Sequence, residues 1–314
     1  MTQASDKSKL HGPYLVGVDG GGSKTQAVIG RRDIDGKIVV LSYGIAGPAN
    51  IQTVSAQQAW DQCRLAIDRA FAELGGTPDE LDAAAFAMAG EGSLPHRKAF
   101  IHEIERSGVV KRLVVTHDAR PLIAGGTPED CGIAMIAGTG SFAFCRNPRG
   151  VEDRCGGWGY LYGDEGSGYS LAIAGLRAAV MAADGRAAAT ELLPALCDWI
   201  GETDARKWLP ILRRWAPEQV AAAAGVVCRI AMHGDDEASR LVQAAGDALS
   251  HHLITLWRRQ FDQAPVHLVL TGGLLIAEQG LRDRVLAGFT KAGGHCAGCR
   301  VIDRPVDTVL HLLD

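Results

Sequence analysis

The chain has 314 residues, of which 47% are hydrophobic and 22% charged, with a formal net charge of −4 at pH 7. That length allows one large or two medium domains, and the composition is that of an ordinary globular protein. The small negative charge gives no broad electrostatic reason to bind nucleic acid or an anionic membrane, and no apolar stretch reaches the roughly 18 residues that a membrane span needs.

The chain opens with "MTQASDKSKLHGPY", which lacks the apolar segment of a secretory signal, so we expect a cytoplasmic protein. Three β-type runs separated by glycine-containing turns follow, which predicts three consecutive antiparallel strands. A helix, a buried strand, a second helix and another buried strand come next, and the expected order is therefore βββαβαβ. The ranges are strands 14–21, 25–32 and 37–44, helix 55–76, strand 81–90, helix 95–108 and strand 112–119.

The same pattern restarts after residue 130. An apolar strand again runs into a glycine turn and a second hairpin strand, followed by a helix, a mostly helical stretch, and a final strand–helix–strand. The ranges are strands 131–141 and 142–150, a helix from about 165, helical residues 187–261, strand 265–273, helix 281–294 and strand 299–303. We therefore predict an α/β protein of two similar domains, 1–120 and 121–304. The second domain carries a helical insert at about 187–261, and a last helix, 305–314, packs on the first domain.

The first glycine turn, in "GVDGGGSKT", is a candidate phosphate-binding loop. A mononucleotide loop needs lysine where this chain has Ser23, and both it and the dinucleotide loop need a helix afterwards, whereas β-type residues follow here. A hairpin turn can still direct N–H groups, hydroxyls and an ammonium group at phosphate oxygens, and Asp19 could hold Mg²⁺ directly or through water. The candidate phosphate ligands are Gly20, Gly21, Gly22, Ser23, Lys24 and Thr25. The alternative is an ordinary hairpin turn.

Two further glycine turns follow apolar strands in the same way, "AGTGS" at 137–141 and "LTGG" at 270–273. Their candidate phosphate ligands are Gly138, Thr139, Gly140, Gly272 and Gly273. Three such turns can converge on one nucleotide, and together they are a more specific signal than any one of them.

Eight cysteines are spread along the chain, several in apolar settings, which predicts reduced thiols that act as small hydrophobic residues. Cys296 and Cys299, beside His295, form the one Cys-x-x-Cys pair. A zinc site normally takes four ligands from two such clusters, so we expect these two thiols to be structural, with metal or redox work as the alternative.

Five segments together resemble the N-acetylglucosamine kinases and the related BadF/BadG/BcrA/BcrD ATPases, in the superfamily of sugar kinases, actin and heat-shock ATPases. The segments are "GVDGGGSKT", "THDA", "IAGTGS", "GGWGYLYGDEGSGYSLA" and "LTGG", in order from about residue 14 to 275. The resemblance implies two ribonuclease-H-like, actin-like ATPase domains flanking an interdomain cleft that takes ATP, Mg²⁺ and a sugar. It also implies a homodimer.

The resemblance makes Asp118 the catalytic base, and a carboxylate at the end of the buried strand "RLVVTHD" otherwise has only turn capping to do. It also implies a set of sugar contacts: Asn50, Gly90, Glu91, Asp118, Gly157, Trp158 and Asp164. The structural alternative for residues 155–169 is a tight loop with a buried anchor tryptophan and an acidic cap, Asp164 or Glu165, for the next helix.

We therefore expect an ATP-dependent kinase that phosphorylates the 6-hydroxyl group of an amino sugar, and N-acetylglucosamine is the expected substrate. The alternatives are a glucosamine or glucose kinase, an ATPase that activates a CoA-ester reductase or dehydratase through an iron–sulfur cluster, and a sugar-sensing protein without catalysis. One departure concerns the last helix, where Asp307 and Thr308 replace the glycine–alanine pair usual in the family. The fit of segment 304–314 against the first domain is therefore an open question for the structure.

Overall fold

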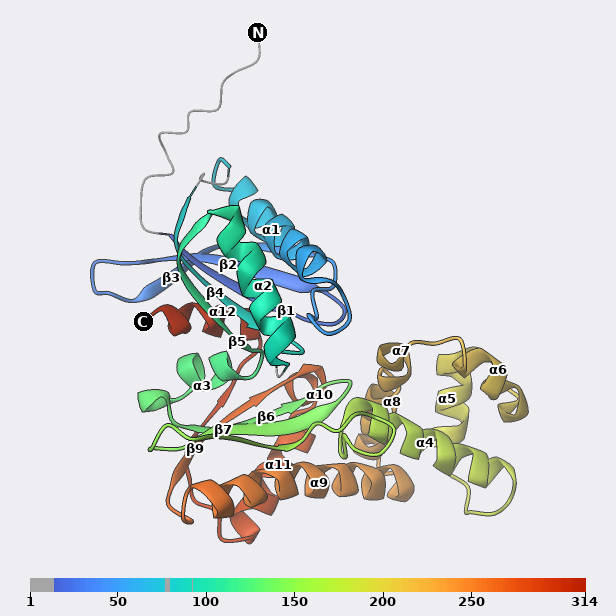
Figure 1. Ribbon diagram of the computed structural model, residues 1–314. Coiled ribbons are helices and arrows are strands. Elements are labelled where there is room, and N and C mark those ends of the chain that lie inside the picture. The colour runs from blue at the N-terminus through green and yellow to red at the C-terminus, as the bar shows by residue number, and fades with distance from the viewer. Residues whose placement is uncertain (1–13, 77–79, 92) are drawn as a thin grey trace. The chain divides into compact units, whose positions relative to one another are not determined.

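The computed structural model describes residues 14–76, 80–91 and 93–314, and the start of the polar opening segment lies outside them. The chain divides into two compact units (Figure 1). Unit 1 runs to Asp130 and includes the returning segment Arg304–Asp314, and unit 2 is Cys131–Asp303. The first unit extends ten residues beyond the boundary expected from the sequence, because α3 (Arg120–Gly126) packs against α12 (Pro305–Val309).

Unit 1 is built on a five-stranded sheet with the order β3-β2-β1-β4-β5. The strands are β1 (Leu15–Gly20), β2 (Thr25–Arg32), β3 (Ile38–Ala46), β4 (Leu81–Met88) and β5 (Val110–His117). The first three pair antiparallel, and β4 and β5 continue the sheet parallel to β1. The predicted antiparallel trio and the order βββαβαβ are thus confirmed.

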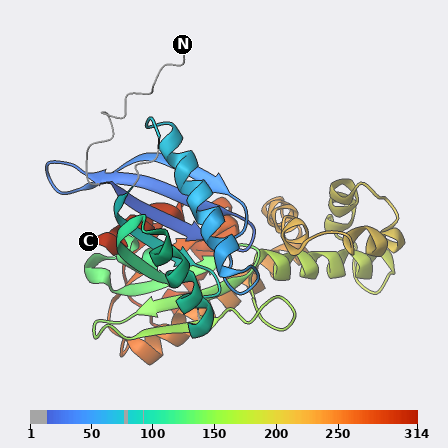
Figure 2. The same ribbon diagram turned by 45° about the horizontal axis from the view of Figure 1, so that its top comes forward.

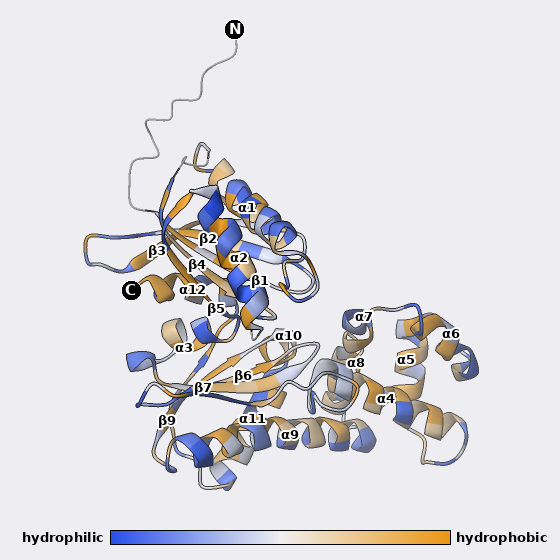
Figure 3. Ribbon diagram, viewed as in Figure 1, coloured by the Kyte–Doolittle hydropathy of each residue, from blue (hydrophilic) through white to orange (hydrophobic). Residues whose placement is uncertain are grey.

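Helices cover both faces of this sheet because residues alternate between its sides. Val16 and Val18 pack under α1 (Ala56–Ala72) and α2 (Leu94–Ser107), which cross the same face in Figure 2. Leu15 faces α12 and the short helix η4 (Leu310–Leu313) on the other side. Figure 3 shows the expected colouring, hydrophobic in the central strands and largely hydrophilic along α1 and α2.

Unit 2 repeats the arrangement, with a sheet of order β10-β9-β6-β7-β8. The strands are β6 (Gly132–Ala137), β7 (Ser141–Arg146), β8 (Glu152–Gly156), β9 (Val266–Thr271) and β10 (Cys296–Val301). Again the first three are antiparallel and the last two are parallel to the first. The predicted topological repeat is confirmed, although the short, charged edge strand β8 was not predicted from the sequence.

The helices of unit 2 lie mostly between β8 and β9. They are α4 (Gly168–Ala183), α5 (Leu192–Ile200), η3 (Ala205–Lys207), α6 (Trp208–Leu212), α7 (Pro217–Ala221), α8 (Ala224–Met232) and α9 (Asp236–Gln260), with α10 (Gly273–Ala277) and α11 (Gln279–Lys291) after β9; η2 (Pro128–Asp130) ends unit 1. The long helix α9 contacts β6, β7 and β8 and belongs to the core of the unit, so the limits of a separate helical insert stay a prediction. No helix among the described residues is long and apolar enough to cross a membrane.

Candidate active site

The parallel strands of unit 1 bring two carboxylates to one edge of the sheet. Asp19 is the penultimate residue of β1, and Asp118 directly follows β5. Strand β4 lies between them, with Asp19 level with Ala87 and Ala87 level with Thr116. Neighbouring strands are about 4.8 Å apart, so the backbones carrying the two carboxylates are separated by about 10 Å, close enough for both side chains to reach one ligand.

The two carboxyl groups interact electrostatically. Burial raises the pKa of Asp19 to about 7, the charge of Asp118 adds to the rise, and Lys24 opposes it. Asp118 is an exposed residue, but the protein around its carboxyl group removes part of the water, and this desolvation raises the pKa of Asp118. His117 and two backbone N–H groups act in the opposite direction and lower that pKa. Two carboxyl groups whose pKa values are raised in this way can both ionise when a divalent cation binds between them. The positive charge of the cation offsets their repulsion, and the cation takes the place of the water that burial removed.

The first glycine turn presents only part of the predicted ligand set. The Gly21 N–H donates to the Lys24 carbonyl at 3.0 Å, which closes the turn, and Ser23 and Lys24 are exposed at its tip. Thr25 differs, because it is fully buried and its hydroxyl donates to the Gly47 carbonyl at 2.7 Å. Thr25 therefore fixes the neighbouring loop, whereas the prediction had its hydroxyl facing a phosphate.

Two loops at the same edge of unit 1 lie against each other. Asn50, after β3, accepts a hydrogen bond from the Gln52 N–H at 2.9 Å through its side-chain oxygen. Gly90, after β4, has a φ of 82° and sits so close to that oxygen that a Cβ atom would overlap it. The structure thus brings together the two residues that the sequence predicted as sugar contacts from separate loops.

Glu91 has a structural partner. Its buried carboxylate pairs with Arg97 at 2.5 Å, and Arg97 also donates to the Val115 carbonyl at 2.8 Å. This arrangement ties the loop after β4 to α2 and β5. The Glu91 carboxylate already has an ion-pair partner within unit 1, so Glu91 is a less suitable sugar ligand than Asn50.

In unit 2, the second glycine turn and the loop after β8 are joined by hydrogen bonds. The Gly168 and Tyr169 N–H groups donate to the carbonyls of Gly138 and Thr139 at 2.8 and 3.1 Å. The Ser141 hydroxyl donates to the Glu165 carbonyl at 2.8 Å. Loop 157–167 is consequently held against the turn on which phosphate binding was predicted.

Asp164 reaches the glycine turn directly. It is 8% exposed, its φ of 58° is uncommon for a residue with a side chain, and its Oδ2 lies so near Gly140 that an added Cβ would be 2.6 Å away. Its other oxygen accepts from the Gly159 N–H at a long 3.3 Å. A buried carboxylate with so few partners retains acceptor capacity for a ligand.

Both structural alternatives for this loop are wrong. Trp158 is 62% exposed, so it is no buried anchor, and the Arg154 guanidinium lies 5.3 Å from its ring centroid. The residue that caps α4 is Ser167, whose hydroxyl accepts from the Ser170 N–H, and neither Asp164 nor Glu165 does so. Gly157 donates its N–H to the Ser141 carbonyl at 3.1 Å, which sets where the loop begins.

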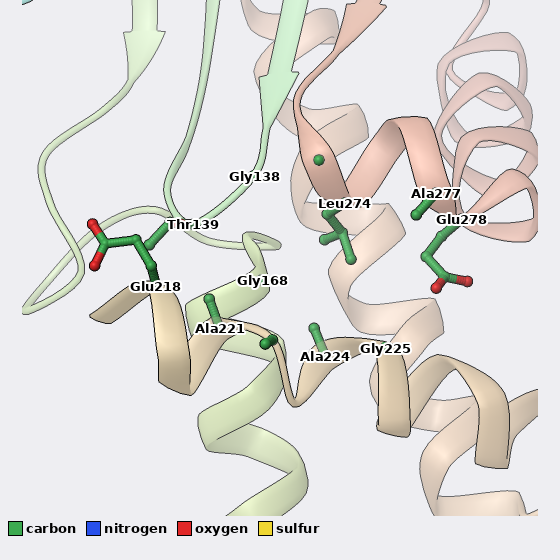
Figure 4. A pocket seen from close by; sticks show the side chains of 12 residues that line it. Gly138, Thr139, Gly168, Glu218, Ala221, Ala224, Gly225, Leu274, Ala277 and Glu278 are labelled. Atoms are coloured by element: carbon green, nitrogen blue, oxygen red, sulfur yellow. The ribbon is translucent and has the colours of Figure 1, made fainter. Parts of the chain in front are cut away.

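Unit 2 has a pocket between the second and third glycine turns and the helices α7, α8 and α10 (Figure 4), with a volume of about 360 Å³. It is lined by Gly138, Thr139, Gly168, Glu218, Ala221, Ala222, Ala224, Gly225, Gly273, Leu274, Ala277 and Glu278. The sequence predicted the contributions of the two turns but missed those of the helices. Their only sequence signal is the run of small residues at 221–225, which is also common in helices packed without a ligand.

The cysteine pair lies away from this pocket, on β10, the edge strand of the sheet in unit 2. Cys296 is half-buried, Cys299 is exposed, and neither forms a disulfide. Within the part of the chain that the structure describes, no three His, Cys, Asp or Glu side chains are grouped as a metal site would require.

Comparisons with known proteins agree with these features. A model of the BadF/BadG/BcrA/BcrD ATPase family matches residues 16–285. The N-acetylmuramic acid/N-acetylglucosamine kinase of Clostridium acetobutylicum is 31% identical over 239 residues, which is 75% of this chain and 76% of that protein. The N-acetyl-D-glucosamine kinase of Dictyostelium discoideum is 25% identical over 251 residues, with the same coverage of each chain.

Among solved structures, a candidate N-acetylglucosamine kinase from Chromobacterium violaceum superposes with a TM-score of 0.74 at 27% identity, covering 96% of this chain and 99% of that one. A ROK family glucokinase from Streptomyces griseus, in complex with glucose and AMPPNP, has a TM-score of 0.60 at 17% identity over 96% and 98% of the two chains, which shows the shared fold alone. By its matched length and its two repeated sheets, this chain belongs to the BadF/BadG/BcrA/BcrD ATPase family, with the two-domain α/β fold of the actin-like sugar kinases.

Proposed function

We propose that this protein transfers the γ-phosphoryl group of ATP to the 6-hydroxyl group of N-acetylglucosamine. The broader class, an ATP-dependent amino-sugar kinase, follows from the family and the named relatives. The observation that supports the proposal most directly is the contact between Asp164 and Gly140. It brings a carboxylate suited to sugar hydroxyls against a turn suited to phosphate, and a phosphoryl transfer needs those two ligands side by side.

The pocket of unit 2 suits the nucleoside part of ATP. Its lining holds two carboxylates, Glu218 and Glu278, and no lysine, arginine or histidine. Such a lining favours hydrogen-bond donors, as ribose hydroxyl groups and a base amino group are, over phosphate. The volume lies at the lower end of small-molecule pockets, and the phosphates would extend to the glycine turns that border it.

Each unit has a loop after its third strand whose side chains suit a sugar. Asp164 accepts hydrogen bonds from sugar hydroxyl groups, Asn50 offers its amide, and the exposed ring of Trp158 can cover an apolar face of the sugar. Gly90 and Gly157 let the backbone approach closely.

The chemistry assigned to unit 1 rests on its two carboxylates. Asp118 accepts the proton from the attacking hydroxyl group, because an alcohol becomes a competent nucleophile only as that proton leaves. Its raised pKa brings it closer to the operating pH, where a base is most effective. Asp19 would hold Mg²⁺, directly or through water, and the ion would neutralise charge on the phosphoryl oxygens; Lys24 adds a second positive charge.

N-acetylmuramic acid is a second candidate substrate, favoured by one observation. The relative from C. acetobutylicum is named for that sugar, which carries a carboxylate that N-acetylglucosamine lacks. Among the described residues, Arg154 has no carboxylate partner, and its guanidinium lies over the ring of Trp158, in the loop assigned to the sugar. An arginine there can bind a substrate carboxylate.

A coupled ADP-release assay over N-acetylglucosamine, N-acetylmuramic acid, glucosamine and glucose tests the proposal. We expect the highest kcat/KM with N-acetylglucosamine and a product whose phosphorus couples to the C6 protons in NMR. ADP release that does not depend on sugar would instead support an ATPase activator. Phosphorylation at another hydroxyl group would overturn the assignment of the 6-position.

A further inference from the structure

The two carboxylates of the pocket lie at opposite ends of it. In Figure 4 the Glu218 carboxylate lies beside Thr139 of the second glycine turn, and Glu278 lies across the pocket beside Ala277. If the glycine turns hold the phosphates, as the proposed function requires, the far end of the pocket takes the part of ATP most remote from them, which is the base. Glu278 therefore faces the base, and Glu218 faces the ribose side.

The Glu278 carboxylate interacts with a thiol. It is hydrogen-bonded to Cys228 of α8, and burial together with that carboxylate raises the pKa of the Cys228 thiol to about 12. Cys228 thus stays protonated near neutral pH and donates its S–H to the carboxylate. The Cys228 thiol and the Glu278 carboxylate therefore interact across the gap between α8 and α10.

Acceptor positions of Glu278 remain for a ligand. The charge of Arg282 influences the carboxylate, but its guanidinium donates to the carbonyls of Leu275 and Ile276, at 2.5 and 2.8 Å. A thiol supplies one hydrogen bond, whereas a carboxylate has about four acceptor sites. A donor on the base can therefore bind it without displacing an existing partner.

We propose that Glu278 determines the choice of nucleobase, by accepting a hydrogen bond from the exocyclic amino group of adenine and disfavouring guanine. Adenine presents an N6 amino donor at the position where guanine presents the O6 acceptor. Guanine would place its oxygen against a carboxylate, and both groups would lose hydrogen bonds to water. A hydrogen bond to a charged group corresponds to about 10–100-fold in affinity, and a polar group left unpaired in a pocket rejects analogues by at least that much.

The test compares ATP, GTP and purine riboside triphosphate, which lacks the amino group, as phosphoryl donors to the best sugar. For the wild-type protein we expect kcat/KM to be about 10–100-fold higher with ATP than with either analogue. In Glu278→Gln the side-chain amide can accept from adenine or donate to guanine. The ATP-to-GTP ratio should therefore fall by about 10-fold, with sugar KM unchanged.

Glu218→Gln is the matched control, because it removes the same charge from the other end of the pocket. It should weaken ATP and GTP to a similar extent and leave their ratio within about a factor of two. A wild-type protein that uses GTP or purine riboside triphosphate as well as ATP would overturn the inference even if the variant fails to fold. A Glu278→Gln variant with the same ATP-to-GTP ratio of kcat/KM as the wild-type protein would also overturn the inference.

Failure of the proposed function gives a different result. In that case no nucleoside triphosphate supports phosphorylation of any sugar, and ATP does not protect the protein against thermal unfolding. A protein that phosphorylates sugar with any nucleotide retains the proposed function, and only its base preference decides the role of Glu278.

Discussion

The two units share one topology but carry different side chains at equivalent positions. Each has an antiparallel trio of strands extended by two parallel strands, and in each a glycine turn joins the first strand to the second. In unit 1 Asp19 lies at the end of β1 just before that turn, Lys24 lies in the turn, and Asp118 follows β5, on the far side of β4. In unit 2 the corresponding turn, Gly138–Gly140, has no charged residue and borders a pocket instead.

The loops that follow the third strand also differ between the units. In unit 1 this loop carries Asn50 and leads directly into α1, whose first turn is closed by a capping box between Ser55 and Gln58. In unit 2 the equivalent loop is longer and carries Trp158 and Asp164 before α4 begins. The repeated topology therefore provides equivalent positions in the two units, and different side chains occupy them: Asp19, Lys24 and Asp118 in unit 1, and Trp158 and Asp164 beside a pocket in unit 2.

The largest expected effect tests the assignment of catalysis to unit 1. Asp118→Asn should lower kcat by about 10²–10⁴, because the amide cannot accept the proton of the sugar hydroxyl, while the KM for ATP stays within a few-fold of wild type. Steady-state kinetics with both substrates measures this. Asp82→Asn, an exposed carboxylate paired with Lys111 in the same unit, is the control and should leave kcat unchanged. A kcat of Asp118→Asn close to that of the wild-type protein would contradict the assignment of the catalytic base to Asp118.

A second prediction tests the binding role of unit 2. Asp164→Asn should raise the KM for sugar by about 10–100-fold with a much smaller change for ATP, since a charged acceptor of sugar hydroxyl groups is lost. Glu165→Gln removes the same charge one residue away, where the side chain is 59% exposed, and should change the KM for sugar little. Equal effects of the two substitutions would show that the loop responds to charge alone and that Asp164 has no direct contact.

A third prediction concerns the second glycine turn. A Cβ at Gly138 would meet nothing closer than the Gly273 nitrogen at 3.4 Å, so Gly138→Val should fold. The larger side chain would still occupy the pocket edge and weaken ATP by about 10-fold while sugar affinity is retained. Separate calorimetric titrations of nucleotide and sugar measure the two effects. A variant that loses sugar affinity alone would contradict phosphate binding at this turn.

The last prediction leaves activity aside and concerns the effect of the buried carboxylate of unit 1 on stability. The pKa of Asp19 is about 7 in the folded protein and near 4 when unfolded, so the folded state binds more protons in between. This group therefore lowers the stability of the wild-type protein as pH rises from about 4 to about 7. Asn at this position removes that loss.

Urea unfolding without divalent cations checks this sign. Relative to wild type, Asp19→Asn should gain about 1–2 kcal/mol in free energy of unfolding at pH 5, rising to about 4 kcal/mol at pH 7 to 8, since one pKa unit corresponds to about 1.4 kcal/mol. Mg²⁺ should reduce the gap by stabilising the wild-type protein alone. Parallel pH profiles for the two proteins would show that Asp19 is not strained by burial.

Local patterns were enough to predict most of the fold. The antiparallel trio of unit 1, α1 and α2 were predicted because alternation, glycine turns and helix ends are properties of neighbouring residues. Strand β8 was missed because it is a short edge strand of mostly exposed or half-buried residues, so it carries no apolar pattern. The position of Asp118 at a strand end was also visible in the sequence, since a carboxylate after a buried apolar run is conspicuous.

Tertiary structure alone decided which side chains meet and which are already engaged. Glu218 and Glu278 share a pocket because α7, α8 and α10 converge, although each lies in an ordinary helical or loop sequence. The Thr25 hydroxyl donates a hydrogen bond to the Gly47 carbonyl, and Glu91 forms an ion pair with Arg97. No local sequence pattern indicates either contact. The physical reason is range: backbone conformation follows from residues a few positions apart, whereas burial and pairing depend on elements that the fold brings together from distant parts of the chain.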